Sequence, residues 1–224
     1  MPRLREPREL TCTAQLESRA WRKGYQYVAG CDEAGRGALL GPLFAAAVIL
    51  DPQKPIAGLD DSKKLTISRR LRLADEIRER AVAFHVVSVA ATLVDSLNVY
   101  EASRRAMLRA LRQLRPAPDF VLTDAMPLNV HGATAEFTVP HLPVIHGDAR
   151  SVSIAAASIL AKVERDACLE ELARLYPQYH LAKNKGYGTP EHLRSLAAHG
   201  PCPEHRKTYQ PVKDLLLPLF PFVT

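Results

Sequence analysis

The chain has few cysteines and no long apolar run. Its 224 residues include only four cysteines, none of them in a CxxC pair or at a zinc-binding spacing. We therefore expect reduced thiols rather than a disulfide framework or a structural zinc site. No run approaches transmembrane length without a charge, and the first residues lack the apolar core of a signal peptide. These absences predict a soluble, cytoplasmic protein that binds no membrane.

Internal repeats, low-complexity tracts and metal-binding histidine spacings are also lacking. The eight histidines form no HxxxH pair, and no Ser-His-Asp arrangement has persuasive spacing, so we expect no protein nucleophile. A hydrophobic content of 47% and a charged content of 24% are ordinary for one globular domain. The net charge of +6 and the pI near 9.2 modestly favour an anionic partner such as a nucleic acid.

The most informative stretch runs from residue 27 to 42 and is followed by an apolar run over 43–50. It predicts a strand, a tight loop and a second strand. Asp32 and Glu33 stand where the first strand ends, and two adjacent negative charges are costly unless a cation neutralises them. The glycines of Gly35-Arg36-Gly37 let a backbone approach another molecule closely. The stretch therefore suggests a metal site that also holds a phosphodiester, although Gly-Arg-Gly alone could be a mere tight turn.

Strand geometry adds a prediction at Glu33. Consecutive residues of a regular strand face opposite sides, so Asp32 and Glu33 cannot both point at one ion. Since Ala34-Gly35 suits a change of direction, we predict a break or bulge beside Glu33.

Periodicity and turn signals predict an α/β fold. Strands are expected at 27–32, 43–50, 82–91, 119–124, 142–145 and near 136–139, and helices over 13–22, 66–80, 94–114, 151–176 and 189–200. The loop of about ten residues between the first two strands favours an antiparallel pair. Later strands alternate with helices, so we expect a mixed sheet flanked by helices.

Three acids share one kind of position. Asp32, Asp124 and Asp148 each follow a short apolar strand, and neighbouring strands that end together would bring them to one sheet edge. Mg²⁺ prefers oxygen ligands, so a few carboxylates suffice. Two such ions about 3.5–4 Å apart can clamp the attacking and leaving oxygens of a phosphodiester. The alternative is that each aspartate caps a loop, the commoner fate of any single one.

Asp166 competes with Asp148 for the same site. The two are 18 residues apart, roughly 27 Å along one continuous helix, so both cannot serve one metal pair. Asp148 precedes the helix N-terminus, where a carboxylate is favoured. We therefore assign Asp166 a structural role, pairing with Lys162 or with a neighbouring element.

With these residues laid out, the chain resembles ribonuclease HII, the bacterial type II ribonuclease H. The resemblance extends in order from about Tyr27 to Val212. The matching segments are Gly30–Gly37 with Gly41-Pro42, Asp61–Leu65, Leu97-Asn98, Ser153–Val163 with Arg165-Asp166, Tyr176-Pro177, Lys185–Thr189 with Glu191-His192, and Gly200-Pro201 with His205-Arg206.

The resemblance implies a ribonuclease H-like fold with a C-terminal helical extension. We expect a partly flexible N-terminal extension (1–24), a catalytic domain (25–178) and a helical extension that completes the substrate site (179–224). The implied activity is Mg²⁺- or Mn²⁺-dependent hydrolysis of RNA paired with DNA, with two ions in the reacting complex. It includes nicking on the 5′ side of single ribonucleotides in duplex DNA, which leaves 3′-hydroxyl and 5′-phosphate ends and serves ribonucleotide excision repair.

The resemblance also implies the site residues. The implied catalytic acids are Asp32, Glu33, Asp124 and Asp148, of which the first three are the implied metal ligands. Gly35, Arg36, Gly37 and Tyr187 are the implied readers of the RNA–DNA junction, where the 2′-hydroxyl distinguishes RNA. Two positions depart from the family pattern: Ala125 stands where glycine is common, and Asn184 where histidine is common.

Basic side chains are the remaining candidates. Lys63, Lys64 and Lys185 lie in matching motifs and are candidate phosphate contacts, as Lys183 is more weakly. A helix face with Arg105, Arg109 and Arg112 is interpreted as solvated surface, and His205 with Arg206 as structural.

Two other functions stay open. One is a catalytically silent module that binds hybrids, and the other is a different nuclease of the same fold, such as a DNA junction resolvase. We expect a monomer that binds RNA–DNA hybrids and ribonucleotide-containing duplex DNA. Whether a sliding clamp also binds is not readable from the residues.

Overall fold

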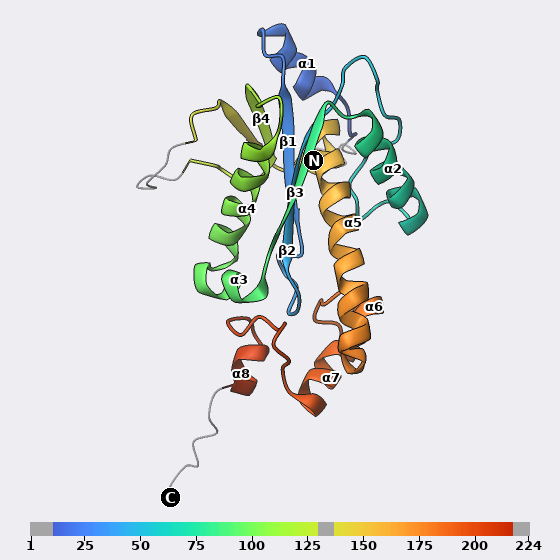
Figure 1. Cartoon of the computed structure of the whole chain (residues 1–224), viewed down its shortest axis with the longest axis vertical. Coiled ribbons are helices and arrows are strands. Elements are labelled where there is room, and N and C mark those ends of the chain that lie inside the picture. The colour runs from blue at the N-terminus through green and yellow to red at the C-terminus, as the bar shows by residue number, and fades with distance from the viewer. Residues whose placement is uncertain (1–10, 130–136, 217–224) are drawn as a thin grey trace, which may run out of the picture.

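The computed structural model describes residues 11–129 and 137–216, which fold around one five-stranded sheet (Figure 1). The strands are β1 (Val28–Ala34), β2 (Leu43–Ile49), β3 (Ala83–Val89), β4 (Phe120–Asp124) and β5 (His141–Val144), in the order β3-β2-β1-β4-β5. β2 is antiparallel to β1 and β3, whereas β4 is parallel to β1 and β5. The predicted mixed sheet, with its antiparallel first pair, is confirmed.

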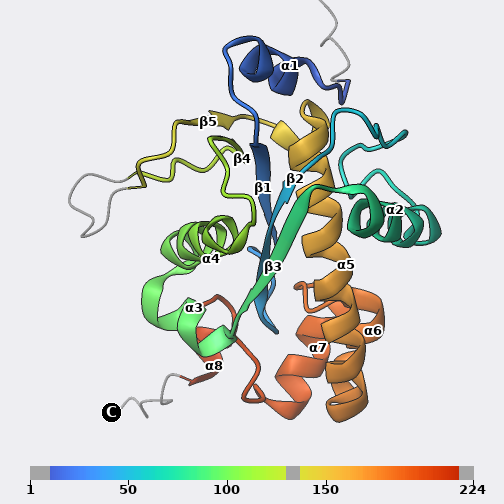
Figure 2. The same ribbon diagram turned by 45° about the horizontal axis from the view of Figure 1, so that its top comes forward.

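Helices cover both faces of the sheet (Figure 1). The α-helices are α1 (Gln15–Arg22), α2 (Ile67–Arg80), α3 (Ala91–Leu97), α4 (Val99–Gln113), α5 (Val152–Leu175), α6 (Leu181–Asn184), α7 (Pro190–His199) and α8 (Val212–Leu216), with short 3₁₀ turns η1 (Gly147–Ala149) and η2 (Pro177–Tyr179). α4 packs on one face, and α5 with α2 on the other. Helices α6 and α7 lie at the far end of α5 and α8 lies below α3 (Figure 2), which confirms the helical C-terminal part. No described helix is long and apolar enough to cross a membrane.

β1 and α5 pack unusually closely because small residues face each other. Ala155, Ala156 and Ala157 of α5 are fully buried. At Gly30 of β1, an added Cβ would lie 2.0 Å from the carbonyl carbon of Ser153, closer than any non-bonded atoms can approach. The two backbones are therefore in direct contact, and this contact brings the start of α5 beside the end of β1.

Two sequence-based predictions need correction in this region of the chain. The single helix over 94–114 is wrong: α3 and α4 are separate helices that meet at Asn98, whose φ is +65° and whose side chain accepts a hydrogen bond from the Glu101 amide. Asparagine tolerates left-handed backbone and caps helices well, so it interrupts a periodic apolar pattern. The strand predicted near 136–139 is not found: residues 137–139 are not in a strand, and residue 136 lies outside the described residues.

Helix α1 lies beside the start of α5 (Figure 2), and its Glu17 supplies a carboxylate there. Glu17 is 1% exposed, and its Oε1 accepts hydrogen bonds from the Ser151 hydroxyl and, at 3.0 Å, from the Ser153 amide. A negative charge at a helix N-terminus is favourable, since the first amides lack partners within the helix. Glu17 therefore ties α1 to the end of α5 that follows Asp148.

We expect Glu17→Ala to lower the free energy of unfolding by about 2–4 kcal/mol, because two buried donors lose a charged acceptor. In a chain of this size, each kcal/mol lowers the melting temperature by about 2–4 °C, which thermal unfolding would detect. Glu79→Ala, at an exposed position of α2, is the matched control and should change little. Equal melting temperatures for the two variants would contradict the role of Glu17.

Candidate active site

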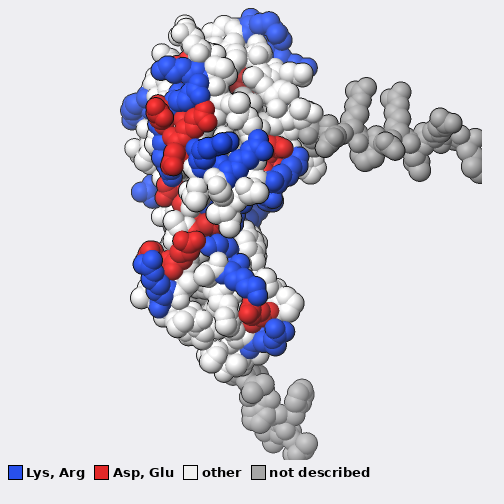
Figure 3. Space-filling view, turned by 90° about the vertical axis from the view of Figure 1, so that its right-hand side faces the viewer, with Lys and Arg blue, Asp and Glu red and all other residues white. Residues whose placement is uncertain are grey.

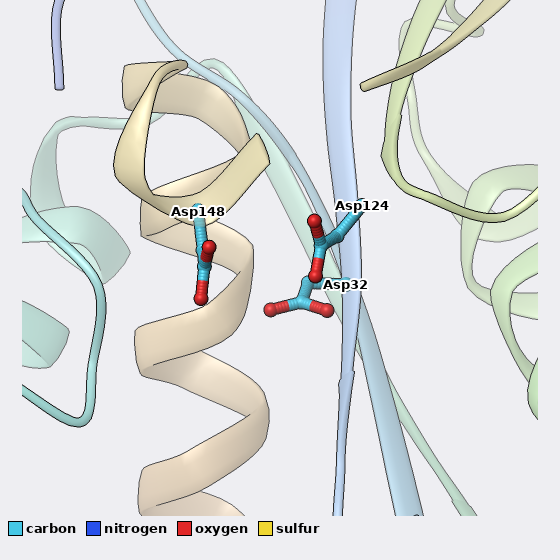
Figure 4. A group of neighbouring side chains, drawn as sticks. All are labelled: Asp32, Asp124 and Asp148. Carbon is cyan, nitrogen blue, oxygen red and sulfur yellow. The ribbon is translucent and has the colours of Figure 1, made fainter. Parts of the chain in front are cut away.

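Three carboxylates meet where the parallel strands end (Figure 4). Cys31 of β1 pairs with Thr123 of β4, so Asp32 and Asp124 follow at the same level of neighbouring strands. Asp148 lies in η1, just before α5. One oxygen from each of the three carboxylates lies within 4.8 Å of the others. The predicted convergence of these acids on one sheet edge is confirmed.

The predicted strand break at Glu33 is wrong. β1 keeps a regular antiparallel register with β2 through the pair Ala34–Phe44, and the chain changes direction only at Gly35, where φ is +91°. Because side chains alternate along a strand, Glu33 lies outside the group of three carboxylates. It lines the same cleft, and its Oε1 is 3.4 Å from the guanidinium of Arg36.

Burial and mutual repulsion disfavour the ionised forms of these acids. Burial, together with the charges of Glu33 and Asp124, raises the pKa of Asp32 well above its ordinary value. Burial likewise raises the pKa of Glu33 to about 7, although the nearby Arg36 opposes the shift. The pKa of Asp148 is raised by burial and by the charges of Asp124 and Asp61. The site therefore concentrates negative charge that a cation would neutralise.

The donor set fits a hard divalent cation. It consists of carboxylate oxygens, the ligands that Mg²⁺ and Mn²⁺ prefer. In addition, Glu33 Oε2 is buried and has no hydrogen-bond partner among residues 11–129 and 137–216. A bound cation would neutralise the negative charge of the carboxylates and give Glu33 Oε2 a partner.

A pH-dependent stabilisation by metal follows from the raised pKa values. A carboxyl with a higher pKa in the folded protein stabilises the fold below its unfolded pKa, and this contribution is lost as the pH rises through the folded pKa. For Glu33 the interval runs from 4.5 to about 7. We therefore expect this cluster to make the metal-free protein less stable at pH 8 than at pH 5. Mg²⁺ or Mn²⁺ should raise the melting temperature more at pH 8.

Thermal unfolding at both pH values, with and without metal, measures this effect. Asp124→Asn is the control. Because it removes one charge, it should reduce both the loss of stability at pH 8 and the rise in melting temperature that the metal causes. If the metal raised the melting temperature equally at pH 5 and pH 8, the result would be inconsistent with a cluster of charged carboxylates.

The acids open into a cleft of about 510 Å³. Most of the predicted substrate-binding residues line it: Gly35, Arg36, Gly37, Lys63 and Tyr187, together with Asp32, Glu33 and Asp124. Lys63 Nζ lies 3.6 Å from Asp148 Oδ2, and although burial opposes its charge, the carboxylates of Asp61 and Asp148 raise the pKa of Lys63. The cleft thus brings together the acids, the Lys63 side chain and the Gly-Arg-Gly loop.

The other two predicted lysines do not line this cleft. Lys64 pairs with Asp60 at 3.4 Å, and Lys185 pairs with Glu170 at 3.0 Å on the side facing α5. The arginines at 105, 109 and 112 are exposed on α4, in agreement with the prediction of a solvated face. On the face that carries α2 and α5, basic and acidic side chains are interspersed rather than separated into one basic patch (Figure 3).

Sequence reasoning missed two hydroxyls of the cleft. Ser62 Oγ lies 3.0 Å from Ser158 Oγ, and a hydrogen bond from Ser158 lowers the pKa of Asp32 against the larger effect of burial. Both serines lie inside segments that match the family, but nothing in the sequence distinguishes them from their acidic and apolar neighbours as residues of the site. Ser158 thus gives Asp32 a polar partner, and Ser62 contacts Ser158.

Asp166 has the structural role that was predicted for it. Its two oxygens contact Lys162 Nζ at 2.6 Å and the Arg70 guanidinium at 3.2 Å. Arg70 in turn donates to the carbonyl oxygens of Ser62 and Leu65. This network holds the loop that carries Lys63.

Two further buried arginines hold the backbone between residues 36 and 42, and one of them bonds to the Gly-Arg-Gly loop itself. Arg165, fully buried, donates to the carbonyl oxygens of Leu40, Pro42 and Lys185. Arg206, also fully buried, donates to the carbonyl oxygens of Arg36 and Gly41. The structural role predicted for residue 206 is confirmed.

The two departures from the family pattern have different local structures. Ala125 adopts a left-handed φ of +49°, which glycine would adopt at lower cost. Asn184 is buried, donates to the Tyr179 carbonyl at 2.6 Å and accepts from the Gly186 amide at 2.9 Å. It therefore shapes the turn that leads to Tyr187.

The fold is that of the type 2 ribonucleases H, as two solved structures show. The structure is similar to ribonuclease H2 from Pyrococcus horikoshii, with a TM-score of 0.70 and 26% identity over 85% of this chain and 97% of that one. It is also similar to Archaeoglobus fulgidus ribonuclease HII, solved in complex with PCNA, with a TM-score of 0.69, 28% identity and coverage of 83% and 96%.

Sequence comparison identifies the family within this class. The family model for ribonuclease HII matches residues 29–212. The chain is 52% identical over 202 residues to ribonuclease HII from Solibacter usitatus, covering 90% of this chain and 86% of the relative. It is 48% identical over 210 residues to the Koribacter versatilis protein, covering 94% and 80%. The chain belongs to the ribonuclease HII family and is a ribonuclease H, an endonuclease.

Proposed function

We propose that this enzyme cleaves the RNA strand of RNA–DNA hybrids and nicks duplex DNA on the 5′ side of single embedded ribonucleotides. The products carry 3′-hydroxyl and 5′-phosphate ends, as ribonucleotide excision repair requires. The observation that carries this proposal is the shared cleft. Buried carboxylates stand on one side of it, and the Gly-Arg-Gly loop and Tyr187 stand beside them. A nucleotide bound in the cleft can therefore contact the metal-binding acids and the groups that recognise its ribose at the same time.

The acids hold the cations in this proposal. Asp32, Glu33 and Asp124 bind Mg²⁺ or Mn²⁺, two ions in the reacting complex, and Asp148 completes the acidic site. When bound, the ions make a water more acidic and stabilise negative charge on the departing 3′ oxygen. The chain itself orients these carboxylates: the Gly147 amide donates to Asp124 Oδ1 at 2.7 Å, and Ser158 contacts Asp32. Among the described residues, Glu33 Oε2 is buried without a hydrogen-bond partner and is available to a ligand.

The loop from Gly35 to Gly37 and the Tyr187 side chain read the ribose. The 2′-hydroxyl both donates and accepts hydrogen bonds, so backbone groups and a phenol are suitable partners. Around Gly37 an added Cβ would meet nothing within 4 Å, which leaves the backbone open to a ligand. The Tyr187 ring is 37% exposed and lies over Arg165, whose guanidinium carbon is 5.3 Å from the ring centroid.

Lysines bind the phosphate backbone in this proposal. Lys63 is the best placed, since it lines the cleft and its side chain is 78% exposed. Lys64 and Lys185 flank the cleft and would contact phosphates further along the duplex, where backbone contacts position rather than specify. We propose that the protein acts as a monomer.

We also propose that residues 25–178 carry the chemistry and that the segment from residue 179 completes the substrate site. Tyr187 and Arg206 support this division: one lines the cleft and the other holds the Gly-Arg-Gly loop. Of the proposed N-terminal extension over residues 1–24, residues 1–10 lie outside the described residues, and the described part supports the start of α5 through Glu17.

Cleavage of three matched duplexes tests the proposed function. The purified protein is incubated with a one-ribonucleotide duplex, a long RNA–DNA hybrid and an all-DNA duplex, with Mg²⁺, with Mn²⁺ and with EDTA. We expect metal-dependent cutting of the first two and none of the third. Cutting of the all-DNA duplex would favour another nuclease of this fold, and binding without cutting would favour a silent hybrid-binding module.

Substitutions of the reading residues should alter substrate preference more than chemistry. We expect Tyr187→Phe and Arg36→Ala each to lower kcat/KM on the one-ribonucleotide duplex by about tenfold or more, the effect of one or two lost hydrogen bonds. Cleavage of the long hybrid, which offers many equivalent ribonucleotides, should fall less. Arg109→Ala, on the exposed face of α4, is the matched control for loss of a positive charge. A parallel loss on both substrates would argue against a reading role.

A further inference from the structure

Two buried histidines form a continuous hydrogen-bonded chain that ends at Tyr187. His192 and His205 are 0% and 1% exposed. The Nδ1 atom of His192 lies 2.9 Å from the Tyr187 carbonyl oxygen, and its Nε2 lies 3.2 Å from Nε2 of His205. The Nδ1 atom of His205 lies 3.0 Å from the Cys202 amide nitrogen. We call these three bonds the histidine relay.

The two fixed ends of the relay determine every proton in it. The Tyr187 carbonyl can only accept, so His192 Nδ1 carries a hydrogen and donates it. At the other end, Cys202 Sγ also lies 3.2 Å from His205 Nδ1, but the Cys202 amide can only donate to that nitrogen, so His205 Nδ1 is a lone pair and His205 Nε2 carries the hydrogen. His205 Nε2–H then donates to the lone pair of His192 Nε2. All three bonds form at once only when both rings are neutral and hold opposite tautomers.

The surroundings keep both rings neutral. Burial, together with the charge of the other ring, lowers the pKa of His205 to about 4, and burial lowers the pKa of His192. The Tyr179 ring packs edge-on against His205, with centroids 4.8 Å apart. The relay is therefore a rigid connection in a low-dielectric environment, where an unpaired polar atom would be costly.

The relay connects the two sides of the site that reads the ribose. At one end, the Tyr187 carbonyl accepts both from His192 and from the Thr189 amide at 2.8 Å. At the other end, the backbone of His205 pairs with Leu40. The next residue, Arg206, donates to the carbonyl of Arg36. A displacement of either ring would thus change the distance between the tyrosine and the Gly-Arg-Gly loop.

We propose that His192 and His205 are positioning residues that fix Tyr187 relative to residues 35–37 and so set the preference for an embedded ribonucleotide. The inference rests on the proposed function, since it assigns the reading role to Tyr187. Neither histidine lines the cleft, so both act through the carbonyl and the loop rather than on the substrate.

A pair of conservative substitutions separates positioning from packing. In His192→Asn the amide nitrogen replaces Nδ1 and can still donate to Tyr187, whereas in His192→Gln the side-chain amide replaces Nε2 and this bond is lost. We expect the glutamine variant to lose about tenfold in kcat/KM on the one-ribonucleotide duplex. The kcat/KM of the asparagine variant on this duplex should stay within about threefold of the wild-type value. His199→Gln, an exposed histidine of the same helix, is the matched control. Equal losses in the two His192 variants would overturn the inference.

Two further measurements test the inference, and the first of them uses only the wild-type protein. In the wild-type protein, ¹⁵N–¹H correlation spectra of the imidazoles should show His192 protonated at Nδ1 and His205 at Nε2. The reverse tautomers would overturn the relay. In a Tyr187→Ala background, His192→Gln should have little further effect if it acts through the tyrosine, whereas an undiminished tenfold loss would contradict it.

These outcomes are distinguishable from a failure of the proposed function. If the wild-type enzyme does not cut a ribonucleotide-containing duplex, the proposed function fails. If it cuts with the expected preference and the glutamine variant matches the wild type, only the histidine inference fails.

Discussion

Asp124→Asn is expected to lower metal-dependent cleavage by at least about a thousandfold while duplex binding survives. The reason lies in one hydrogen bond. Asp124 Oδ1 accepts from the Gly147 amide at 2.7 Å, and in the variant only the amide oxygen can take that place. The amide nitrogen is then forced toward Asp32 and Asp148, where it presents hydrogens instead of a lone pair. The substitution thus replaces a cation ligand with a donor without changing the volume of the side chain.

Cleavage of a one-ribonucleotide duplex and filter binding of the same duplex measure the two parts of this expectation. Thermal unfolding without metal should show a fold at least as stable as the wild type, because Asp124 raises the pKa of Asp32, Glu33 and Asp148 by repulsion. Asp75→Asn, an exposed position on α2, is the control and should retain full activity. Undiminished cleavage by the Asp124 variant would refute the proposed site.

Gly30→Ala is expected to lower the free energy of unfolding by at least about 3 kcal/mol, which corresponds to a fall of about 6–12 °C in melting temperature. The new methyl group would lie 2.0 Å from the Ser153 carbonyl carbon and 2.3 Å from the Ile154 nitrogen. Both are backbone atoms of the first turn of α5, so no side-chain rotation can make room. The helix must move away from β1, and the core between them would open.

Gly37→Ala is the matched control for stability, since an added Cβ there would meet nothing within 4 Å. Its melting temperature should stay close to that of the wild type, whatever happens to substrate reading. Circular dichroism melts of the two variants, run together, measure the difference. A Gly30→Ala protein as stable as the wild type would show that β1 and α5 are not in contact at this point.

The architecture and the position of the acids were largely readable from the sequence. Short apolar strands followed by aspartates predicted that Asp32, Asp124 and Asp148 would converge, because parallel strands end at one sheet edge. The incompatibility of Asp148 and Asp166 followed from helix length alone. Both predictions use only regular backbone geometry, which a sequence pattern specifies well.

Other features depend on contacts that no pattern shows. The break predicted at Glu33 assumed that both adjacent acids must face one ion. The structure instead keeps the strand regular and leaves Glu33 at the edge of the cleft. The split at Asn98 reflects one residue in a left-handed conformation, which the apolar period on either side conceals. Ser62 and Ser158 approach each other only because α5 crosses the sheet, 96 residues along the chain from the loop.

Three of the buried arginines, Arg70, Arg165 and Arg206, have a consequence for how the cleft can change during evolution. They donate hydrogen bonds mainly to backbone carbonyl oxygens of the surrounding loops. Every amino acid has such an oxygen. The loop side chains that face the cleft are therefore free to be exchanged while the path of the backbone is kept. Substrate preference and architecture can then vary independently, so new specificities could arise on this scaffold without a loss of stability.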